Sequence, residues 1–200
     1  MFKNLKKDSI NESFLAGVTF KYKKKNIYLV PVGLWILRNN KLLKLINKKR
    51  RLSNKFFMND ISKNLAKTKN FFRDILSNKN MCLFLICSKQ KSFKGLIGLN
   101  YVNQKIEIYF VLKLKKNSFM RTSLKNLINF SSNRSTIKKF IVKVLSNNKR
   151  AKRLYYNLGF KNYKKYYLRK VKKNGLNSHF ICLKKLTNVN YFYETLKFTN

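Results

Sequence analysis

Tyr155 and Glu107 are two of the residues of this chain whose side chains could move a proton to or from a bound substrate. Tyr155 has a phenol, which is neutral at pH 7 and can donate a proton to a departing anion. Glu107 is one of only 6 acidic residues beside 47 basic ones, and a carboxylate near an amine can accept its proton directly or through water. Both also have a structural interpretation: Tyr155 as a packed aromatic, and Glu107 as a surface strand residue paired with a nearby lysine.

Metal and disulfide chemistry are not expected. The 3 cysteines, Cys82, Cys87 and Cys182, and the single histidine, His179, form no CxxC pair and no Cys/His cluster of metal-ligand spacing. An odd number of cysteines also argues against a disulfide framework and favours a reducing compartment. A lone histidine in an expected strand is more often structural than catalytic.

The hydrophobic pattern predicts the elements that hold these side chains. Apolar or alternating runs predict strands at 26–32, 81–87, 95–102, 105–114, 140–144, 161–169 and 178–183. Helical spacing predicts helices after the first strand, after a cap at Asn59 or Asp60, after residue 118, and from 148 to 159. This order is typical of an α/β fold, a single domain with a mixed central sheet of about seven strands flanked by helices.

The segment at 105–114 has the pattern of a strand with one buried face. It contains Glu107, and its apolar residues alternate with other residues, so we expect them all on one face of the sheet. They are Ile106, Ile108, Phe110, Leu112 and Leu114.

The segment from residue 140 to residue 160 reads FIVKVLSNNKRAKRLYYNLGF. It resembles the strand–helix signature of the GCN5-related N-acetyltransferases (the GNAT family), V-x-x-x-N-x-x-A/S-x-x-L-Y-x-x-x-G-F. The residues in register are Val144, Asn148, Ala151, Leu154, Tyr155, Gly159 and Phe160. The order of the expected elements is also similar to that of a GNAT domain.

The resemblance implies an N-acetyltransferase with acetyl-coenzyme A as co-substrate, an amine of an amino sugar or a protein as acceptor, and no metal. It implies that Tyr155 protonates the departing thiolate and that Glu107 accepts the proton of the amine. Backbone N–H groups of the strand at 105–114 would stabilise the oxyanion. The positions that it assigns to the coenzyme are Phe110, Val111, Leu112, Asn148 and Ala151.

A second GNAT signature is a phosphate-binding turn, Q/R-x-x-G-x-G/A, which brings backbone N–H groups at a helix start to a pyrophosphate. The matching positions are Lys115, Ser118 and Met120, so both glycines are absent. Lysines beside a helix start can hold a pyrophosphate by charge instead. Alternatively, the site has decayed and the lysines are solvated. The candidate coenzyme-binding residues here are Lys115, Lys116, Ser118, Met120 and Arg121.

The formal net charge of +41 favours a polyanionic partner. It supports a second hypothesis, in which a degenerate GNAT domain is a basic RNA- or ribosome-binding module without catalysis. The stretch 161–170, KNYKKYYLRK, interleaves basic and aromatic residues that suit backbone contacts and base stacking. The same stretch also fits a final strand with tyrosines packed on the sheet. Attachment to an anionic membrane surface is a third option.

We expect the domain at 26–185, after a basic N-terminal extension at 1–25 and before a C-terminal tail at 186–200. The longest apolar run, 27–37, contains Pro31 and Gly33 and spans about half of a membrane helix, so no transmembrane segment is expected. The N-terminus carries Asp8 and Glu12 and lacks the apolar core of a signal peptide. These features predict a cytoplasmic protein.

Overall fold

The computed structural model describes the chain apart from residues 1–2, 23, 58–59, 90–91, 116–118, 134–136, 138, 174–175, 183–191 and 200. The helices are η1 (Lys3–Leu5), α1 (Ile10–Leu15), α2 (Trp35–Arg38), α3 (Asn40–Leu52), η2 (Asn54–Phe56), α4 (Leu65–Ser77), α5 (Met120–Asn133) and α6 (Lys149–Tyr156). The strands are β1 (Val18–Tyr22), β2 (Lys25–Pro31), β3 (Met81–Cys87), β4 (Phe93–Val102), β5 (Lys105–Lys113), β6 (Lys139–Leu145), β7 (Lys161–Lys173), β8 (Leu176–Cys182) and β9 (Phe192–Thr199).

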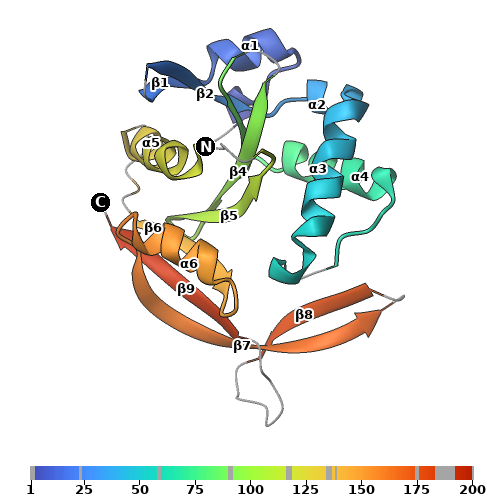
Figure 1. Ribbon diagram of the computed structural model, residues 1–200, viewed down its shortest axis with the longest axis vertical. Helices are drawn as coiled ribbons and strands as arrows, with labels where there is room; N and C mark the ends of the chain where they lie inside the picture. Colours follow the sequence, from blue (N-terminus) through green and yellow to red (C-terminus); the bar gives the residue numbers. More distant parts are fainter. Residues whose placement is uncertain are drawn as a thin grey trace.

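One sheet contains all the strands of the described chain, in the order β1-β2-β3-β4-β5-β6-β9-β7-β8 (Figure 1). Neighbouring strands are antiparallel except β5 and β6, which are parallel. The predicted class, an α/β fold with a mixed sheet flanked by helices, is therefore confirmed. The described sheet has nine strands instead of about seven.

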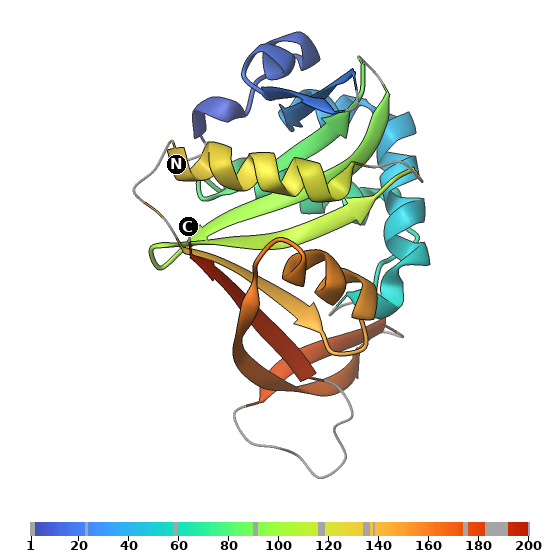
Figure 2. The ribbon, with the colours of Figure 1, turned by 60° about the vertical axis from the view of Figure 1, so that its left-hand side comes forward.

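Helices cover the sheet on both sides. Helices α5 and α6 lie on one side, and α3 and α4 lie on the other (Figures 1 and 2). Each side has its own hydrophobic layer, because buried side chains of the strands point alternately to the two faces. Leu124 and Leu127 of α5 belong to the first layer, and Leu43 and Ile46 of α3 belong to the second.

A β-bulge in β5 reverses this alternation. Ile108 pairs with Leu99 of β4, but the next pair joins Phe110 to Gly98, so Tyr109 is the extra residue. Ile108 therefore packs in the layer under α5 and α6, whereas Phe110 packs in the layer under α3 and α4. The prediction that the apolar residues from Ile106 to Leu114 share one face is wrong, since a bulge shifts the residues beyond it to the other face.

Both ends of the chain contribute strands to the sheet. The expected extension at 1–25 contains β1, which pairs with β2 from Val18–Leu29 to Tyr22–Lys25. The expected tail at 186–200 contains β9, which lies between β6 and β7 and pairs with both. Two strands of the described sheet therefore lie outside the expected bounds of 26–185.

The second predicted helix begins later than expected. Asn64 caps α4, because its side-chain oxygen accepts a hydrogen bond from the N–H of Ala66 at 2.8 Å. Asn59 lies outside the described residues. Asp60 instead contacts the start of β8, where its Oδ2 accepts a hydrogen bond from the N–H of Asn177 at 2.8 Å.

Candidate functional site

Strands β5 and β6 run together for only a short distance and then part. Their register consists of three pairs, Ile106–Phe140, Glu107–Ile141 and Ile108–Val142. Beyond them β5 continues along β4, and β6 continues along β9. Residues 110–112 of β5 thus have no strand partner on the β6 side in the described chain. An extended ligand with amide groups can pair with such a free strand edge.

Helix α6 begins directly after β6, next to this opening. Asn148 is its N-cap: its Oδ1 accepts a hydrogen bond from the N–H of Ala151 at 3.1 Å. Ala151 packs against the hydrophobic layer of this face. At the other end of the helix Gly159 has φ +89°, a left-handed conformation that glycine adopts without strain. The helix, its N-cap at Asn148 and the glycine at its C-terminal end were therefore predicted correctly.

Tyr155 is deeply buried on the face of α6 that packs against the sheet. It is 4% exposed, and its ring meets Phe160 edge-on at a centroid distance of 5.7 Å. Burial raises the pKa of the Tyr155 phenol above its ordinary value, because the charged form is desolvated. The group is therefore a neutral O–H at physiological pH. These surroundings match the packed-aromatic interpretation.

Glu107 is paired with a lysine of the adjacent strand. Its Oε1 lies 3.1 Å from Nζ of Lys143, and the Glu107 side chain is 13% exposed. Because Ile106 and Ile108 pack under α5 and α6, the intervening Glu107 points to the face of α3 and α4. The lysine partner of the structural interpretation is thus confirmed and is Lys143. Sequence periodicity did not reveal this partner, because the contact crosses two strands that are joined through α5.

The turn before α5 is only partly described: Lys116 and Ser118 lie outside the described residues. Lys115 is exposed. Phe119 has φ +53°, so the left-handed position that a glycine would normally take is occupied by a phenylalanine. Its ring packs edge-on against Tyr22 at a centroid distance of 5.5 Å.

The side chains of the first turn of α5 point in different directions. Met120 packs inward, since its Cε would lie 3.0 Å from a Cβ on Gly95 of β4. The Met120 side chain therefore fills the space between the first turn of α5 and the sheet. Arg121 is exposed, and its Nη2 donates a hydrogen bond to the carbonyl of Asn157 at 3.2 Å. Arg121 thereby connects the start of α5 to the end of α6.

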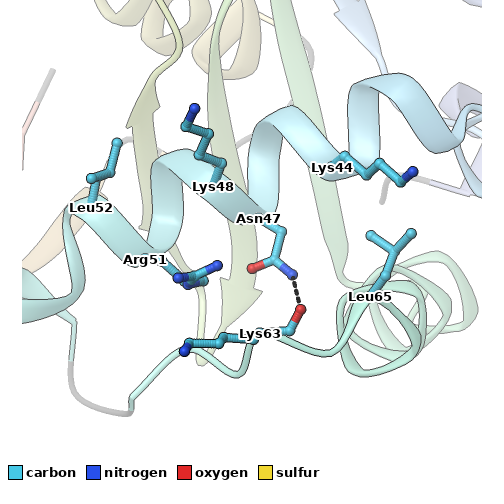
Figure 3. Close-up of a pocket in the computed structure, with 7 residues that line it drawn as sticks. All are labelled: Lys44, Asn47, Lys48, Arg51, Leu52, Lys63 and Leu65. Carbon is cyan, nitrogen blue, oxygen red and sulfur yellow. Dashed lines mark hydrogen bonds between the residues drawn. The ribbon is translucent and has the colours of Figure 1, made fainter.

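Two of the hollows on the surface of the described chain are large enough to compare with the site. The smaller, about 300 Å³, lies beside the start of α5 and is lined by Arg121, Lys125, Ile128, Asn129, Asn157, Leu158 and Phe198. The larger, about 510 Å³, lies on the outer side of α3 and is lined by Lys44, Asn47, Lys48, Arg51, Leu52, Lys63 and Leu65 (Figure 3). It is formed by α3, the following loop and the start of α4, and β5 and β6 do not line it.

Within the residues described, no group of three or more histidine, cysteine, aspartate and glutamate side chains could hold a metal ion. None of the helices among these residues has the length and apolar character needed to cross a bilayer.

A family model described as an acetyltransferase (GNAT) domain matches residues 40–161, more than half of the chain. The chain belongs to the GNAT family. The matched residues run from α3 to the start of β7 and include Glu107, the parting of β5 and β6, and Tyr155. No curated protein matches this GNAT chain.

Solved structures of other GNAT proteins share the fold. Spermidine N-acetyltransferase from Vibrio cholerae, in complex with CoA and spermine, aligns with TM-score 0.62 at 14% identity over 86% of this chain and 95% of that one. A probable GNAT acetyltransferase from Chromobacterium violaceum aligns with TM-score 0.65 at 11% identity, covering 86% and 87%. The microcin C7 self-immunity acetyltransferase MccE, in complex with acetyl-CoA and AMP, aligns with TM-score 0.61 at 16% identity, covering 87% and 92%.

Proposed function

We propose that this GNAT protein transfers an acetyl group from acetyl-CoA to a primary amine. The observation that carries the proposal is the parting of β5 and β6 after three residue pairs. The pantetheine arm of CoA is an extended chain with two amides, so it can pair with the free edge of β5 as a strand would. The thioester would then lie beside residues 110–112, whose backbone N–H groups are candidates for stabilising the oxyanion.

In the proposed step, the nitrogen of a neutral amine attacks the thioester carbonyl, a C–N bond forms and the C–S bond breaks. The departing thiolate takes up a proton, and the amine loses one. Tyr155 is the proposed donor to the thiolate, because it occupies the tyrosine position of the GNAT strand–helix signature and its phenol is neutral at pH 7. Glu107 is the proposed acceptor of the amine proton, directly or through water, and Lys143 at 3.1 Å keeps it in place.

The proposed acceptor is an amine of an amino sugar or a protein, not a polyamine. The solved Vibrio cholerae relative is a spermidine N-acetyltransferase with spermine bound, and a polycation of that kind requires carboxylates. On the face of α3 and α4, the carboxylate beside the parted strands in the described chain is Glu107, a single carboxylate that is paired with Lys143.

Calorimetric titration with acetyl-CoA at about 0.3 M salt tests the proposal, with ATP as the control because a protein of net charge +41 binds any polyphosphate at low salt. We expect saturable binding of acetyl-CoA that is well above that of ATP. Equal and salt-sensitive binding of both ligands would show that the pocket does not recognise pantetheine, and the enzymatic proposal would then fail.

A second candidate function, RNA binding without catalysis, is favoured by the surroundings of Tyr163. This residue of β7 is 45% exposed. The ammonium groups of three lysines lie 5.4–5.7 Å from its ring centroid; they are Lys105, Lys164 and Lys197. An exposed ring among cations can stack on a base while the lysines contact phosphates.

Fluorescence anisotropy with labelled poly(U) tests this second candidate. An RNA module predicts that Tyr163→Leu weakens binding about tenfold, since stacking on one base contributes about 1–3 kcal/mol. The control is Tyr156→Leu, because Tyr156 is also exposed but its hydroxyl donates to Asn162 at 2.8 Å. Equal affinities of the two variants would argue for diffuse charge attraction alone.

A further inference from the structure

Arg50 is a charged residue on the buried face of α3. It is 9% exposed and follows Leu42, Leu43 and Ile46 on the side of the helix that faces the sheet. Its guanidinium carbon lies 4.1 Å from the ring centroid of Phe71 and 5.7 Å from that of Phe110. The rings of Phe71 and Phe110 are themselves 5.7 Å apart. The guanidinium is thus held between a helix and a strand by two aromatic faces.

The charge of Arg50 has no protein counter-ion in the described chain. Its Nε is enclosed and has no hydrogen-bond partner, and the ion pair found among the described residues joins Lys143 to Glu107 instead. Desolvation lowers the pKa of Arg50 to about 10, so the group stays charged at pH 7. An unpaired buried cation is unfavourable, and the favourable response is an anion that supplies the missing charge and acceptors.

The position of Arg50 connects it with the proposed reaction site. Phe110 lies in the part of β5 that has parted from β6, directly after the bulge at Tyr109. Phe110 and Glu107 belong to the same face of the sheet, the face covered by α3 and α4. Three residues of a strand span about 7–10 Å, so Glu107 lies about that far along β5 from Phe110, whose ring contacts Arg50.

We propose that Arg50 binds an anionic group of the acceptor, a carboxylate or a phosphate, and thereby places the amine near Glu107. This inference rests on the proposed acetyl transfer and assigns the acceptor a class: a compact amine that also carries a negative charge. The planar guanidinium presents donors that match the two oxygens of a carboxylate or phosphate, and the two phenylalanine rings hold it in one orientation. The same charge disfavours a polycationic acceptor.

Arg51 provides a matched control. It is the next residue of the same helix and carries the same charge, but it is exposed and lines the outer hollow of α3 (Figure 3). A neutral residue at position 51 removes one charge from the surface and leaves the aromatic contacts of Arg50 intact. Diffuse attraction of anions by the whole surface therefore predicts equal effects of Arg50 and Arg51 substitutions.

The test measures calorimetric binding of matched amines to the CoA-saturated protein and, with acetyl-CoA, the release of free thiol. The pairs are glucosamine 6-phosphate with glucosamine, and β-alanine with its amide. For at least one pair, we expect the wild type to bind the anionic member about tenfold to a hundredfold more tightly. Arg50→Met should abolish this preference, Arg51→Gln should retain it, and Arg50→Lys should retain part of it.

Equal affinity for the two members of both pairs, or a preference that survives in Arg50→Met, would overturn the proposal. Arg50→Met is expected to fold, because an unbranched apolar side chain replaces an unpaired charge in an apolar layer. Its melting temperature without ligand should equal or exceed that of the wild type. Failure of the proposed acetyl transfer would appear separately, as absence of acetyl-CoA binding or of thiol release, whereas the anion preference is measured by binding alone.

Discussion

Tyr155 and Tyr156 are consecutive residues of α6 with opposite surroundings. Substitution of Tyr155, with Tyr156 as the control, therefore tests the proposed proton transfer. Tyr155 is 4% exposed and Tyr156 is 40% exposed. We expect Tyr155→Phe to lower kcat by about 10²-fold or more, because the thiolate then leaves without a proton donor. Tyr156→Phe should change kcat little. Steady-state measurement of thiol release from acetyl-CoA, with any amine that the protein accepts, checks both.

The phenylalanine at position 155 keeps the ring that packs against Phe160 at 5.7 Å. The melting temperature of Tyr155→Phe should therefore stay close to that of the wild type. Full activity in this variant would mean that Tyr155 is a packed aromatic and nothing more. Loss of folding would also contradict the proposed proton transfer, because it would assign the hydroxyl a structural role.

At the residue scale, the sequence predicted what depends on neighbours along the chain. The cap formed by Asn148 and the C-terminal glycine of α6 are local, so their spacing was enough to place them. Arg50 follows Leu42 and Ile46 at intervals of four residues, a spacing that would have placed it on the buried face. Its contacts with Phe71 and Phe110 could not be read in the same way, because α4 and β5 bring those rings to it.

At the scale of one element, the bulge of β5 depends on a glycine in β4. A Cβ at Gly98 would lie 2.7 Å from Cε1 and Cζ of Tyr109 and 2.9 Å from Cδ2 of Leu83. Gly98→Ala should therefore lower the free energy of unfolding by about 1–3 kcal/mol, as overpacked cores do. Urea denaturation checks the value.

Gly98→Ala should also impair the proposed reaction site. The Tyr109 ring lies over Gly98, and displacing it disturbs the bulge that turns Phe110 toward Arg50. We expect a loss of thiol release in Gly98→Ala under conditions in which the variant is still folded. An alanine variant with wild-type stability would contradict the close packing of Tyr109 on Gly98.

The sequence did not predict β1 and β9, the strands nearest the two ends of the chain. β9 reads FYETLKFT and alternates like a strand, but nothing in those residues indicates that they insert between β6 and β7. The position of β9 is determined by its backbone pairing with both neighbouring strands. It pairs with β6 from Lys139–Thr199 to Leu145–Tyr193, and with β7 from Lys161–Lys197 to Tyr167–Phe192. The interior strands β3 and β4 were predictable because continuous apolar runs indicate burial on both faces.

The segment before α1 stabilises the end of a distant helix. Nζ of Lys6 donates hydrogen bonds to the carbonyls of Ile75, Leu76 and Asn78, at 2.7, 2.9 and 2.6 Å. These carbonyls at the C-terminal end of α4 carry partial negative charge and lack partners within the helix. Lys6→Met should lower the free energy of unfolding by about 1–2 kcal/mol.

Urea denaturation of Lys6→Met beside Lys7→Met checks this role. Lys7 is adjacent and carries the same charge, but its contact with the fold is through its backbone carbonyl, which accepts a hydrogen bond from the N–H of Leu34 at 3.1 Å. The Lys7 variant should therefore lose less stability. Equal losses would mean that general charge, and not the cap on α4, determines the effect of Lys6.

At the scale of the whole molecule, one aspartate joins two halves of the chain. Asp60, in the loop between α3 and α4, accepts hydrogen bonds from the backbone N–H and Nδ2 of Asn177 at 2.8 and 2.9 Å. Its own N–H donates to the carbonyl of Asn177 at 2.9 Å. The two residues are 117 positions apart, so sequence spacing gave no sign of the contact, and Asp60 resembled a helix cap.

This contact predicts a pH-dependent stability. The backbone hydrogen bond from Asn177, first among several causes, lowers the pKa of Asp60 below its ordinary value. The stabilisation is therefore present above the ordinary pKa of an aspartate and is lost as the pH falls through the lowered value. Asp60→Asn should be less stable than the wild type at pH 7, and the difference should shrink as the pH falls toward about 3.5.

Urea denaturation of Asp60→Asn and Asp74→Asn across this pH range separates the contact from a general loss of negative charge. Asp74 is exposed on α4, so its substitution removes the same charge without breaking a link between distant segments. We expect the Asp74 variant to be closer to the wild type at pH 7 than the Asp60 variant. A difference between Asp60→Asn and wild type that stays constant with pH would mean that Asp60 holds the start of β8 by shape alone. The ionised carboxylate would then contribute nothing to the joining of the two halves.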